Sequence, residues 1–250
     1  MDEHVIEIFN LHKSYGKVKA LNGLTLYVNK GEIYGLIGPN GAGKTTTLKI
    51  LVGLLKPDKG LVRVCGYDVI SDRVSALKHV GYIPENPVAF QNLTVTEFIK
   101  FIATLRGLKP SDIEDDMKHY LEVFELYDKR DKLISELSRG MLQKTLAIAA
   151  FIVKPKVLIM DEPMSGMDPE AQFIFKREVE KLVKIGVSAL ISSHILDMVE
   201  KFCTKIGIIH EGRLLLEGPI EKIKEVIIDR QDATLEEVFL KIIREEEFSE

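Results

Sequence analysis

Short apolar runs separated by polar turns recur along the chain and predict β-strands. The runs "VIEIF" (5–9) and "LTLYV" (24–28) are rich in β-prone residues and have Gly and Lys around them. Four further runs are short and nearly all apolar, as expected of strands that are covered on both faces: "IYGLIG" (33–38), "VLIM" (157–160), "SALIS" (188–192) and "IGIIH" (206–210).

Helical patterns lie between several of these runs. The segment "EAQFIFKREVEKLVKIG" (170–186) has helical periodicity and closes with Gly186, a typical residue just beyond a helix end. The segment "IIHEGRLLLEG" (208–218) predicts a hairpin that turns at Glu211 and Gly212. Alternation of strands and helices favours an α/β fold with a mostly parallel sheet and an N-terminal antiparallel β part.

The middle of the chain is different, because strand patterns fade between 92 and 151 and helical patterns dominate. The segment 94–108 has apolar residues at helical spacing, with Thr94 or Thr96 as its cap. A second helix is predicted over 112–127. Helices inserted between the first and the later strands indicate a separate helical lobe.

These patterns predict how the chain is organised. One domain is expected over 1–218, with an α/β core formed by 1–85 and 156–218 and an inserted helical lobe at 86–155. A helical extension is expected at 219–250, in which 233–250 predict an amphipathic helix with an acidic frayed end.

Composition narrows the classes of function. The 250 residues are enough for one substantial core, and the formal net charge of −4 provides no general attraction to nucleic acid, although a local basic patch stays open. Cys65 and Cys203 are far apart and outside any metal-binding spacing, so both are expected to be small buried apolar residues, compatible with a reducing compartment.

No membrane or export segment is expected in the sequence. It opens with the acidic "MDEHVIEIFN", and its apolar stretches, such as "LAIAAFIV" (146–153), are shorter than the ~18 residues of a membrane-spanning helix. The chain is therefore expected to be soluble by itself, and any action at a membrane requires another protein that spans it.

The stretch "GPNGAGKTT" (38–46) matches GxxxxGK[ST] between a predicted strand and a predicted helix. Its glycines let the backbone curl so that N–H groups face an anion, and the helix N-terminus adds positive potential. Lys44 would reach the terminal phosphates, and the Thr45 hydroxyl would occupy one Mg²⁺ position. The predicted nucleotide-binding residues are Gly38, Pro39, Asn40, Gly41, Ala42, Gly43, Lys44, Thr45 and Thr46.

A pair of carboxylates follows the apolar run of "VLIMDEP" (157–163). Ligands of open α/β sheets bind at the carboxyl ends of the strands, which is where Asp161 and Glu162 are expected. Asp161 would hold Mg²⁺, directly or through water, and Glu162 has the position of a base that polarises the attacking water. A simple helix cap is the alternative for adjacent acids, and the nearby phosphate loop makes it the weaker one.

Taken in order, these motifs resemble the nucleotide-binding subunits of ATP-binding cassette (ABC) transporters, over nearly the whole chain. The resemblance implies a RecA-like P-loop NTPase core and places Tyr15 on the adenine. Besides the phosphate loop and "LIMDEP" (158–163), the matching stretches are "KSYG" with Tyr15, "GYIPEN" (81–86), "LSRGM" (137–141), "SGMD" (165–168) and "SSH" (192–194).

The stretch "LSRGM" predicts a second anion-binding site. Ser138 is a suitable N-cap for the helix that follows, and its hydroxyl, the Gly140 N–H and the helix dipole together favour an anion. The resemblance implies that this signature, Ser138 to Met141, caps the γ-phosphate bound by a partner chain. Two copies, or this chain and a paralogous subunit, would then enclose two ATP molecules head to tail and separate after hydrolysis.

The resemblance also assigns two later residues. His194 is implied to hydrogen-bond the γ-phosphate and to orient the attacking water. Asp168 is implied to contact the partner across the interface. The implied catalytic residues are thus Lys44, Glu162 and His194, and the implied Mg²⁺ ligands are Thr45, Asp161 and Glu85.

Three positions depart from the commonest family pattern: Glu85 replaces Gln, Arg139 replaces Gly, and Met141 replaces Gln. Glu85 can still bind Mg²⁺ but adds negative charge. Arg139 either adds positive charge near the nucleotide or faces solvent. Glu85 and "EEVF" (236–239) resemble the exporter-type subfamily, in which ATPase and permease are separate chains.

The predicted function is ATP hydrolysis that drives a separate multispanning permease, with the chain cytoplasmic at the inner membrane face. Its helical lobe and the segment 86–94 would form the groove for the permease. The alternative is a soluble ABC ATPase acting on nucleic acid or the ribosome, although the sequence has no long coiled coil, zinc cysteines or second cassette. A P-loop kinase or GTPase would lack the signature and the switch histidine.

Overall fold

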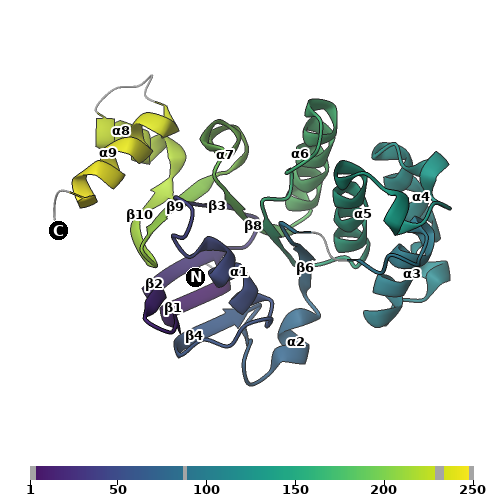
Figure 1. The fold of residues 1–250 in the computed structure, drawn as a ribbon, viewed down its shortest axis with the longest axis horizontal. Coiled ribbons are helices and arrows are strands. Elements are labelled where there is room, and N and C mark those ends of the chain that lie inside the picture. The colour runs from purple at the N-terminus through teal and green to yellow at the C-terminus, as the bar shows by residue number, and fades with distance from the viewer. Residues whose placement is uncertain (1–3, 87–88, 229–233, 248–250) are drawn as a thin grey trace.

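The computed structural model describes residues 4–86, 89–228 and 234–247 (Figure 1). Its strands form two sheets. The antiparallel sheet has the order β2-β1-β4-β5 and consists of β1 (His4–Tyr15), β2 (Val18–Asn29), β4 (Lys59–Val64) and β5 (Tyr67–Asp68). This confirms the predicted N-terminal antiparallel part and adds β4 and β5, which the apolar pattern alone did not predict.

The second sheet has the order β10-β9-β3-β8-β7-β6 and carries the predicted parallel strands. All its pairings are parallel except that of β9 with β10. That pair is the predicted hairpin, and Glu211 (φ 46°) and Gly212 (φ 75°) form its left-handed turn. Its strands are β3 (Ile33–Ile37), β6 (Val80–Ile83), β7 (Val157–Asp161), β8 (Ser188–Ser193), β9 (Lys205–His210) and β10 (Arg213–Pro219).

The second sheet is covered on both faces, which explains its nearly all-apolar strands. One core cluster joins the antiparallel sheet, helix α1 (Lys44–Leu51) and side chains such as Leu36, Ile159 and Leu190. A second cluster packs the other face, through Ile37, Met160 and Ile191, against the helices. Because both faces of the sheet are buried, close packing fixes where each strand ends and in which direction it points. The carboxyl ends of these strands form the site described below.

Helices α3, α4 and α5 form the lobe at the end of the molecule opposite the C-terminal helices (Figure 1). Helix α3 (Val95–Leu105) begins with a capping box, in which Thr94 and Glu97 bond each other's backbone N–H groups. This settles the cap in favour of Thr94, since the Thr96 hydroxyl donates to the Arg130 carbonyl instead. Helix α3 ends earlier than the predicted 108, because the chain turns at Gly107 with φ 79°.

The remaining helices of the lobe are α4 (Glu114–Val123) and α5 (Arg139–Ile152). The prediction of one helix over 112–127 was too long, because Pro110–Ile113 is a 3₁₀ turn and Glu125 adopts φ 57°, which ends the α-helix. Two more 3₁₀ turns, Tyr127–Lys129 and Ile134–Glu136, lead into α5. The short helix α2 (Arg73–Leu77) lies between β5 and β6 in sequence and was not predicted.

Helix α6 (Pro169–Lys184) agrees with the predicted helix and is followed by Gly186 at φ 99°. Helix α7 (Leu196–Phe202) follows β8. The predicted extension at 219–250 contains α8 (Ile220–Ile228) and α9 (Leu235–Glu247), and α8 is the helix that the pattern did not predict. The expected acidic frayed end reaches residues 248–250, which lie outside the described residues. The division at 85/86, 155/156 and 218/219 stays a prediction.

The two cysteines differ in burial. Cys203 is buried as predicted, and burial raises the pKa of its thiol, which keeps it protonated and inert. Cys65 is only partly buried and lies in a turn at φ 51°, so the prediction of two buried cysteines was wrong for this residue. The turn follows β4, where Cys65 packs against the edge of the core cluster without being enclosed by it.

Candidate functional site

The loop between β3 and α1 is shaped by close backbone packing at its glycines. A Cβ on Gly38 would lie 2.2 Å from the Ile209 carbonyl oxygen, and one on Gly43 would lie 2.5 Å from the Ala20 carbonyl oxygen. Gly41 and Gly43 also adopt φ 83° and 110°. Gly43 is the N-cap of α1 and no side chain caps this end. The first N–H groups of the helix are therefore free to bind an anion.

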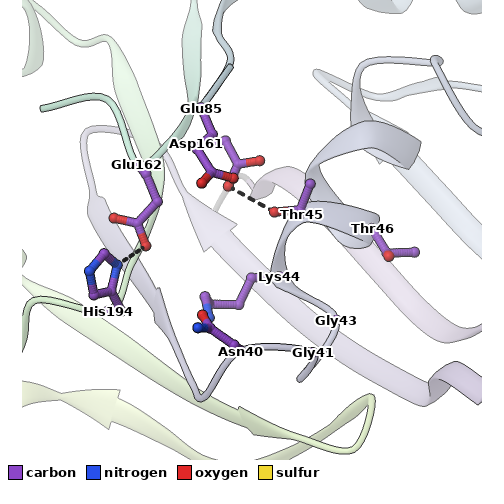
Figure 2. A pocket seen from close by; sticks show the side chains of 10 residues that line it. All are labelled: Asn40, Gly41, Gly43, Lys44, Thr45, Thr46, Glu85, Asp161, Glu162 and His194. Atoms are coloured by element: carbon purple, nitrogen blue, oxygen red, sulfur yellow. Dashed lines mark hydrogen bonds and ion pairs between the residues drawn. The ribbon is translucent and has the colours of Figure 1, made fainter. Parts of the chain in front are cut away.

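Lys44 projects from the first position of α1 into the curve of this loop (Figure 2). Its Nζ donates to the carbonyl oxygens of Gly38, at 2.6 Å, and of Pro39, at 2.9 Å. Burial lowers the pKa of Lys44, while the carboxylates of Glu162, Asp161 and Glu85 raise it and limit that shift. The loop thus holds the Lys44 ammonium within the electrostatic influence of three carboxylates.

Asp161 ends strand β7 and is 2% exposed. Its Oδ1 accepts hydrogen bonds from the Thr45 hydroxyl at 3.2 Å and from the Ser192 hydroxyl at 2.5 Å. β7 is hydrogen-bonded to β8, and Asp161 pairs with Ser192 in the ladder, so the fold places both side chains at one sheet edge. The site thus contains a buried carboxylate and a threonine hydroxyl, oxygen donors of the kind that Mg²⁺ binds.

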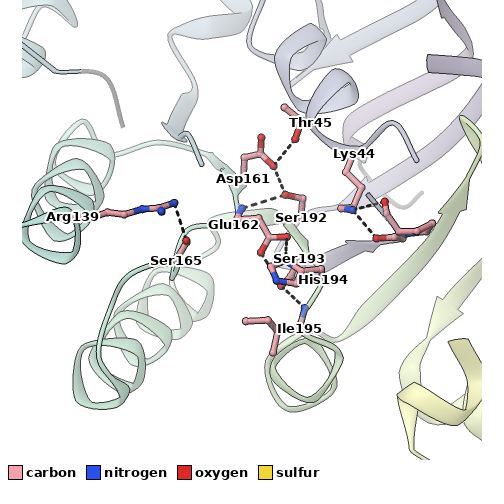
Figure 3. A network of polar contacts seen from close by, with 12 residues as sticks. Lys44, Thr45, Arg139, Asp161, Glu162, Ser165, Ser192, Ser193, His194 and Ile195 are labelled. Carbon is pink, nitrogen blue, oxygen red and sulfur yellow. Dashed lines mark hydrogen bonds and ion pairs between the residues drawn. The ribbon is translucent and has the colours of Figure 1, made fainter. Parts of the chain in front are cut away.

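Glu162 follows Asp161 in a left-handed conformation, with φ 45°. This backbone geometry turns its side chain toward the end of β8, where Oε1 lies 2.7 Å from His194 Nδ1 (Figure 3). The Ser193 hydroxyl donates to the other carboxylate oxygen at 3.2 Å. The His194 side chain is 63% exposed and the Glu162 side chain is 13% exposed. The carboxylate is therefore largely shielded from solvent, while the imidazole that contacts it lies at the surface.

These residues line one cavity of about 300 Å³ (Figure 2). Its lining joins segments that are far apart in the sequence: the loop before α1, the segment after β6, the end of β7 and the end of β8. The lining residues are Asn40, Gly41, Gly43, Lys44, Thr45, Thr46, Glu85, Asp161, Glu162 and His194.

Other predicted site residues lie outside this cavity. Gly38 and Ala42 are enclosed by packing, and Pro39 contributes a carbonyl to Lys44. Tyr15 ends β1, is 51% exposed, and lies under the ammonium of Lys13, whose Nζ is 5.9 Å from the ring centroid. The structure does not bring Tyr15 to the cavity lining, and its role on adenine stays a prediction.

The signature Ser138 to Met141 lies at the start of α5, and its residues are not part of the cavity lining. Figure 3 shows Arg139 of the signature on the far side of Asp161 and Glu162 from Lys44. Ser138 is the N-cap, and its Oγ accepts from the Met141 N–H at 3.3 Å. Asp168 is the N-cap of α6, where it accepts from the Ala171 N–H at 2.8 Å. The predicted helix start at Ser138 is thereby confirmed, while its role toward a partner chain stays a prediction.

Three residues of the site were missed from the sequence. Ser192 and Ser193 fix the carboxylates of Asp161 and Glu162, and their signal was a pair of small hydroxyls at the carboxyl end of a strand whose centre is apolar. Gln143 is buried on α5 and donates to the Pro84 carbonyl at 3.4 Å, so it connects the lobe to the segment that carries Glu85. Nothing in the local sequence pattern signals that contact.

A larger apolar groove of about 520 Å³ adjoins the cavity. It shares Thr45, Glu85 and Asp161 with the cavity and extends over the helical lobe. Burial raises the pKa of Tyr82 in this groove to about 12, so its phenol stays neutral. The other groove residues are Lys49, Leu54, Pro84, Asn86, Phe90, Phe98, Ile102 and Leu146.

Among residues 4–86, 89–228 and 234–247, no helix has both the length and the apolar character needed to cross a membrane. The same residues hold no cluster of three or more His, Cys, Asp or Glu side chains that could bind a metal ion. A cation bound at Asp161 would thus depend on ligands from elsewhere, such as hydroxyls, water or phosphate oxygens.

Comparison with known proteins agrees with this geometry. The sequence pattern of the family described as "ABC transporter" matches residues 21–165. The chain is 36% identical to "Nod factor export ATP-binding protein I" of Paraburkholderia xenovorans (strain LB400), over 87% of this chain and 72% of that protein. It is also 36% identical to "Bacitracin transport ATP-binding protein BcrA" of Bacillus licheniformis, over 88% of this chain and 72% of that protein.

Solved structures share the fold. One described as "Structure of ATP binding subunit of ABC transporter" superposes with a TM-score of 0.90 at 31% identity, over 96% of this chain and 99% of the other. A "nucleotide-free ATP-binding cassette from an ABC transporter" superposes with a TM-score of 0.77 at 26% identity, over 91% of this chain and 96% of the other. The similarity therefore extends over nearly the whole chain, including the segments that follow the matched family pattern.

Proposed function

The chain belongs to the ABC transporter family as an ATP-binding subunit, and we propose that it hydrolyses ATP at the cavity between α1 and the ends of β7 and β8. The observation that carries this proposal is the contact between Glu162 and His194, 2.7 Å apart, beside the phosphate loop. Members of this family are generally ATPases, and the pair supplies the groups that hydrolysis requires.

Hydrolysis in this site uses the residues as follows. The free N–H groups of α1 and the Lys44 ammonium bind the β- and γ-phosphates. Water attacks the γ-phosphorus, its proton passes to the Glu162 carboxylate, and the bond to the β-phosphate oxygen breaks, so that ADP leaves with the electron pair. His194 holds Glu162 through Nδ1, and with both ring nitrogens protonated its Nε2–H would donate to the γ-phosphate.

The donor set fits Mg²⁺, with Asp161, the Thr45 hydroxyl and Glu85 as the residues that would hold it. Mg²⁺ would neutralise charge on the phosphate oxygens when bound. The Ser192 hydroxyl, 2.5 Å from Asp161 Oδ1, keeps the carboxylate oriented toward Thr45. Glu85 is an acid where the common family pattern has Gln, and its extra charge strengthens the site's preference for a cation.

Two copies would complete the site. The signature at the start of α5 is a helix N-terminus with Ser138 and Gly140, and it does not line the cavity of its own chain. We place it against the γ-phosphate of a partner, which is either a second copy or a paralogous subunit, with Asp168 and Tyr15 in the roles that the family resemblance implies. Loss of the γ-phosphate then removes the contact that joins the two halves.

The apolar groove is the proposed contact with the permease. Phe90 is 59% exposed and lies edge-on to Phe101, so apolar side chains extend from the groove to the surface of the lobe. A cytoplasmic helix of a membrane permease would bury them, and the groove shares Glu85 with the cavity, which links permease movement to the phosphates. The chain would thus act in the cytoplasm at the inner membrane face.

The names of the relatives support export as the direction of transport, since they include a Nod factor export protein. Action on nucleic acid or on the ribosome is less well supported. The net charge of −4 provides no general attraction to a polyanion, and the relatives named above belong to transport systems.

The decisive variant is Glu162→Gln, which keeps the side-chain shape but removes the basic carboxylate. Hydrolysis should fall by roughly 100-fold or more, as expected on loss of a general base, while ATP binding persists. Because ATP is then not consumed, the variant should form a stable dimer in Mg-ATP, measured by light scattering on a sizing column.

Glu180→Gln on the exposed face of α6 is the matched control and should hydrolyse ATP and elute like the wild type. A Glu162→Gln protein that still hydrolyses ATP at the wild-type rate would show that another group activates water. A variant that retains ATP but stays monomeric would contradict the two-copy arrangement.

A further inference from the structure

Arg139 stands where most members of the family have a glycine, and its surroundings give it a specific contact. Its Nη2 donates to the Ser165 hydroxyl at 3.0 Å (Figure 3). No ion pair of the described chain includes Arg139, so this hydrogen bond is the polar contact that orients the guanidinium. The contact joins the start of α5 to the loop between β7 and α6.

The backbone of the two segments is also in direct contact. A Cβ on Gly140 would lie 2.5 Å from the Gly166 carbonyl oxygen, which leaves no room for a side chain. Gly166 adopts φ 80°, and a Cβ there would lie 3.2 Å from Arg139 Cγ and 3.3 Å from Cδ. The aliphatic stem of Arg139 therefore lies across Gly166, and the guanidinium reaches Ser165 just beyond it.

The loop contacted by Arg139 begins at Glu162 and ends at Asp168. Two hydrogen bonds shape it, from the Ser165 N–H to the Glu162 carbonyl and from the Met167 N–H to the Met164 carbonyl, both at 3.1 Å. Met164 and Met167 anchor it in the core, while Ser165 and Gly166 are the parts nearer the surface. Those two residues are the ones that Arg139 contacts, and both Arg139 and Gly166 are exposed.

We propose that Arg139 is a positioning residue that fastens the loop 162–168 to the start of α5, so that Glu162 and the signature move as one unit. This inference rests on the proposed hydrolytic function of Glu162. It assigns the unusual arginine to a contact within its own chain, and not to direct charge stabilisation of a nucleotide.

The test is a double-mutant cycle with Arg139→Gln and Ser165→Ala, in which kcat and KM for Mg-ATP are measured separately. Each single variant should lower kcat by roughly threefold to tenfold with KM changed less than twofold, because a loosened loop misplaces the base but leaves the phosphate loop intact. The double variant should lose no more than the single variants, since both remove the same contact. Ser165→Thr keeps the hydroxyl and should restore kcat.

Arg244→Gln is the matched control, because it removes an exposed arginine from α9 at the opposite end of the molecule. It should leave kcat and KM unchanged. If Arg139 instead acted by charge on the nucleotide, Arg139→Gln would raise KM with strong salt dependence while Ser165→Ala had no effect, and the proposal would be overturned. Two single variants with wild-type kinetics would overturn it as well.

A second readout does not depend on hydrolysis. Hydrogen exchange of the loop amides, followed by mass spectrometry on peptides covering 162–168, should be roughly fivefold faster in both single variants, because the contact that tethers the loop to α5 is lost. If the wild type hydrolyses no ATP, the proposed function fails while this measurement still decides whether Arg139 fastens the loop. Unchanged exchange in both variants would contradict the link directly.

Discussion

Lys44 combines charge with burial, since it is 8% exposed and its pKa is affected by Glu162, Asp161 and Glu85. Burial lowers the pKa of its ammonium, and the three carboxylates oppose that shift. Its Nζ donates to two loop carbonyls, which hold the cation in the curve of the loop where a phosphate oxygen would bind. A single side chain thus preorganises the loop for an anion.

Lys44→Ala should weaken ATP binding by about 10-fold to 100-fold, because a charge-assisted hydrogen bond to phosphate contributes roughly 1.5–3 kcal/mol. Titration calorimetry or a fluorescent ATP analogue gives the affinity. Lys56→Ala removes the same charge from an exposed position just after α1, outside the lining of the cavity and of the groove, and should bind ATP as the wild type does. Undiminished affinity in Lys44→Ala would refute the assignment of the phosphate loop.

Among the elements, α3 shows how local sequence sets a helix boundary. The Thr94 hydroxyl accepts from the Glu97 N–H at 3.2 Å, and the Glu97 carboxylate accepts from the Thr94 N–H at 2.8 Å. These reciprocal bonds satisfy two backbone groups that the helix itself cannot pair. The cap fixes where α3 begins, and with it the position of Phe98 and Ile102 in the apolar groove.

Thr94→Ala should lower the free energy of unfolding by about 1 kcal/mol, the usual cost of losing an N-cap side chain. Thr94→Ser keeps an oxygen at the same position and should stay within a few tenths of a kcal/mol of the wild type. Urea unfolding followed by circular dichroism measures both. Equal loss in the two variants would show that the methyl group of Thr94, and not the cap, supplies the stability.

At the scale of the whole molecule, Glu200 joins the C-terminal helices to the core. It lies on α7, the helix that follows His194, and its carboxylate accepts from Lys224 of α8 at 2.7 Å and from the Leu235 N–H of α9 at 2.8 Å. Partial burial raises the pKa of Glu200, but these two hydrogen bonds outweigh it, and the net shift is downward from the ordinary 4.5. One carboxylate thereby connects three helices.

A carboxylate whose folded pKa is lowered stabilises the fold above its unfolded pKa and loses that contribution as the pH falls. Glu200→Gln should therefore cost about 1 kcal/mol at pH 7, after allowance for screening by water. The difference between wild type and variant should shrink as the pH falls below 4.5, where the wild-type carboxyl takes up its proton.

Urea unfolding at pH 7 and near pH 3.5 measures this dependence. Glu221→Gln, at the exposed start of α8, is the control and should show little difference at either pH. A Glu200→Gln deficit that is the same size at both values would mean that the side chain acts through shape and not through its charge.

Much of this fold follows from local pattern. The apolar runs gave the buried strands, the Glu211-Gly212 turn gave the hairpin, and the phosphate loop was visible because a helix N-terminus and its glycines are contiguous in sequence. Weakly patterned pieces were missed, such as the edge strand β5 and the short helix α2, since neither has enough residues to show a period. Non-glycine residues in the left-handed conformation, such as Glu125, also could not be predicted, because no local sequence pattern marks them.

The sequence by itself determined the family, the α/β class and the identity of the acids and the histidine, because these depend on short contiguous motifs. Only the tertiary structure decided which groups touch: Ser192 with Asp161, His194 with Glu162, Gln143 with Pro84, and Arg139 with Ser165. The physical reason is that such contacts depend on the register of β7 against β8 and on close packing of α5, and no residue reveals its distant neighbour.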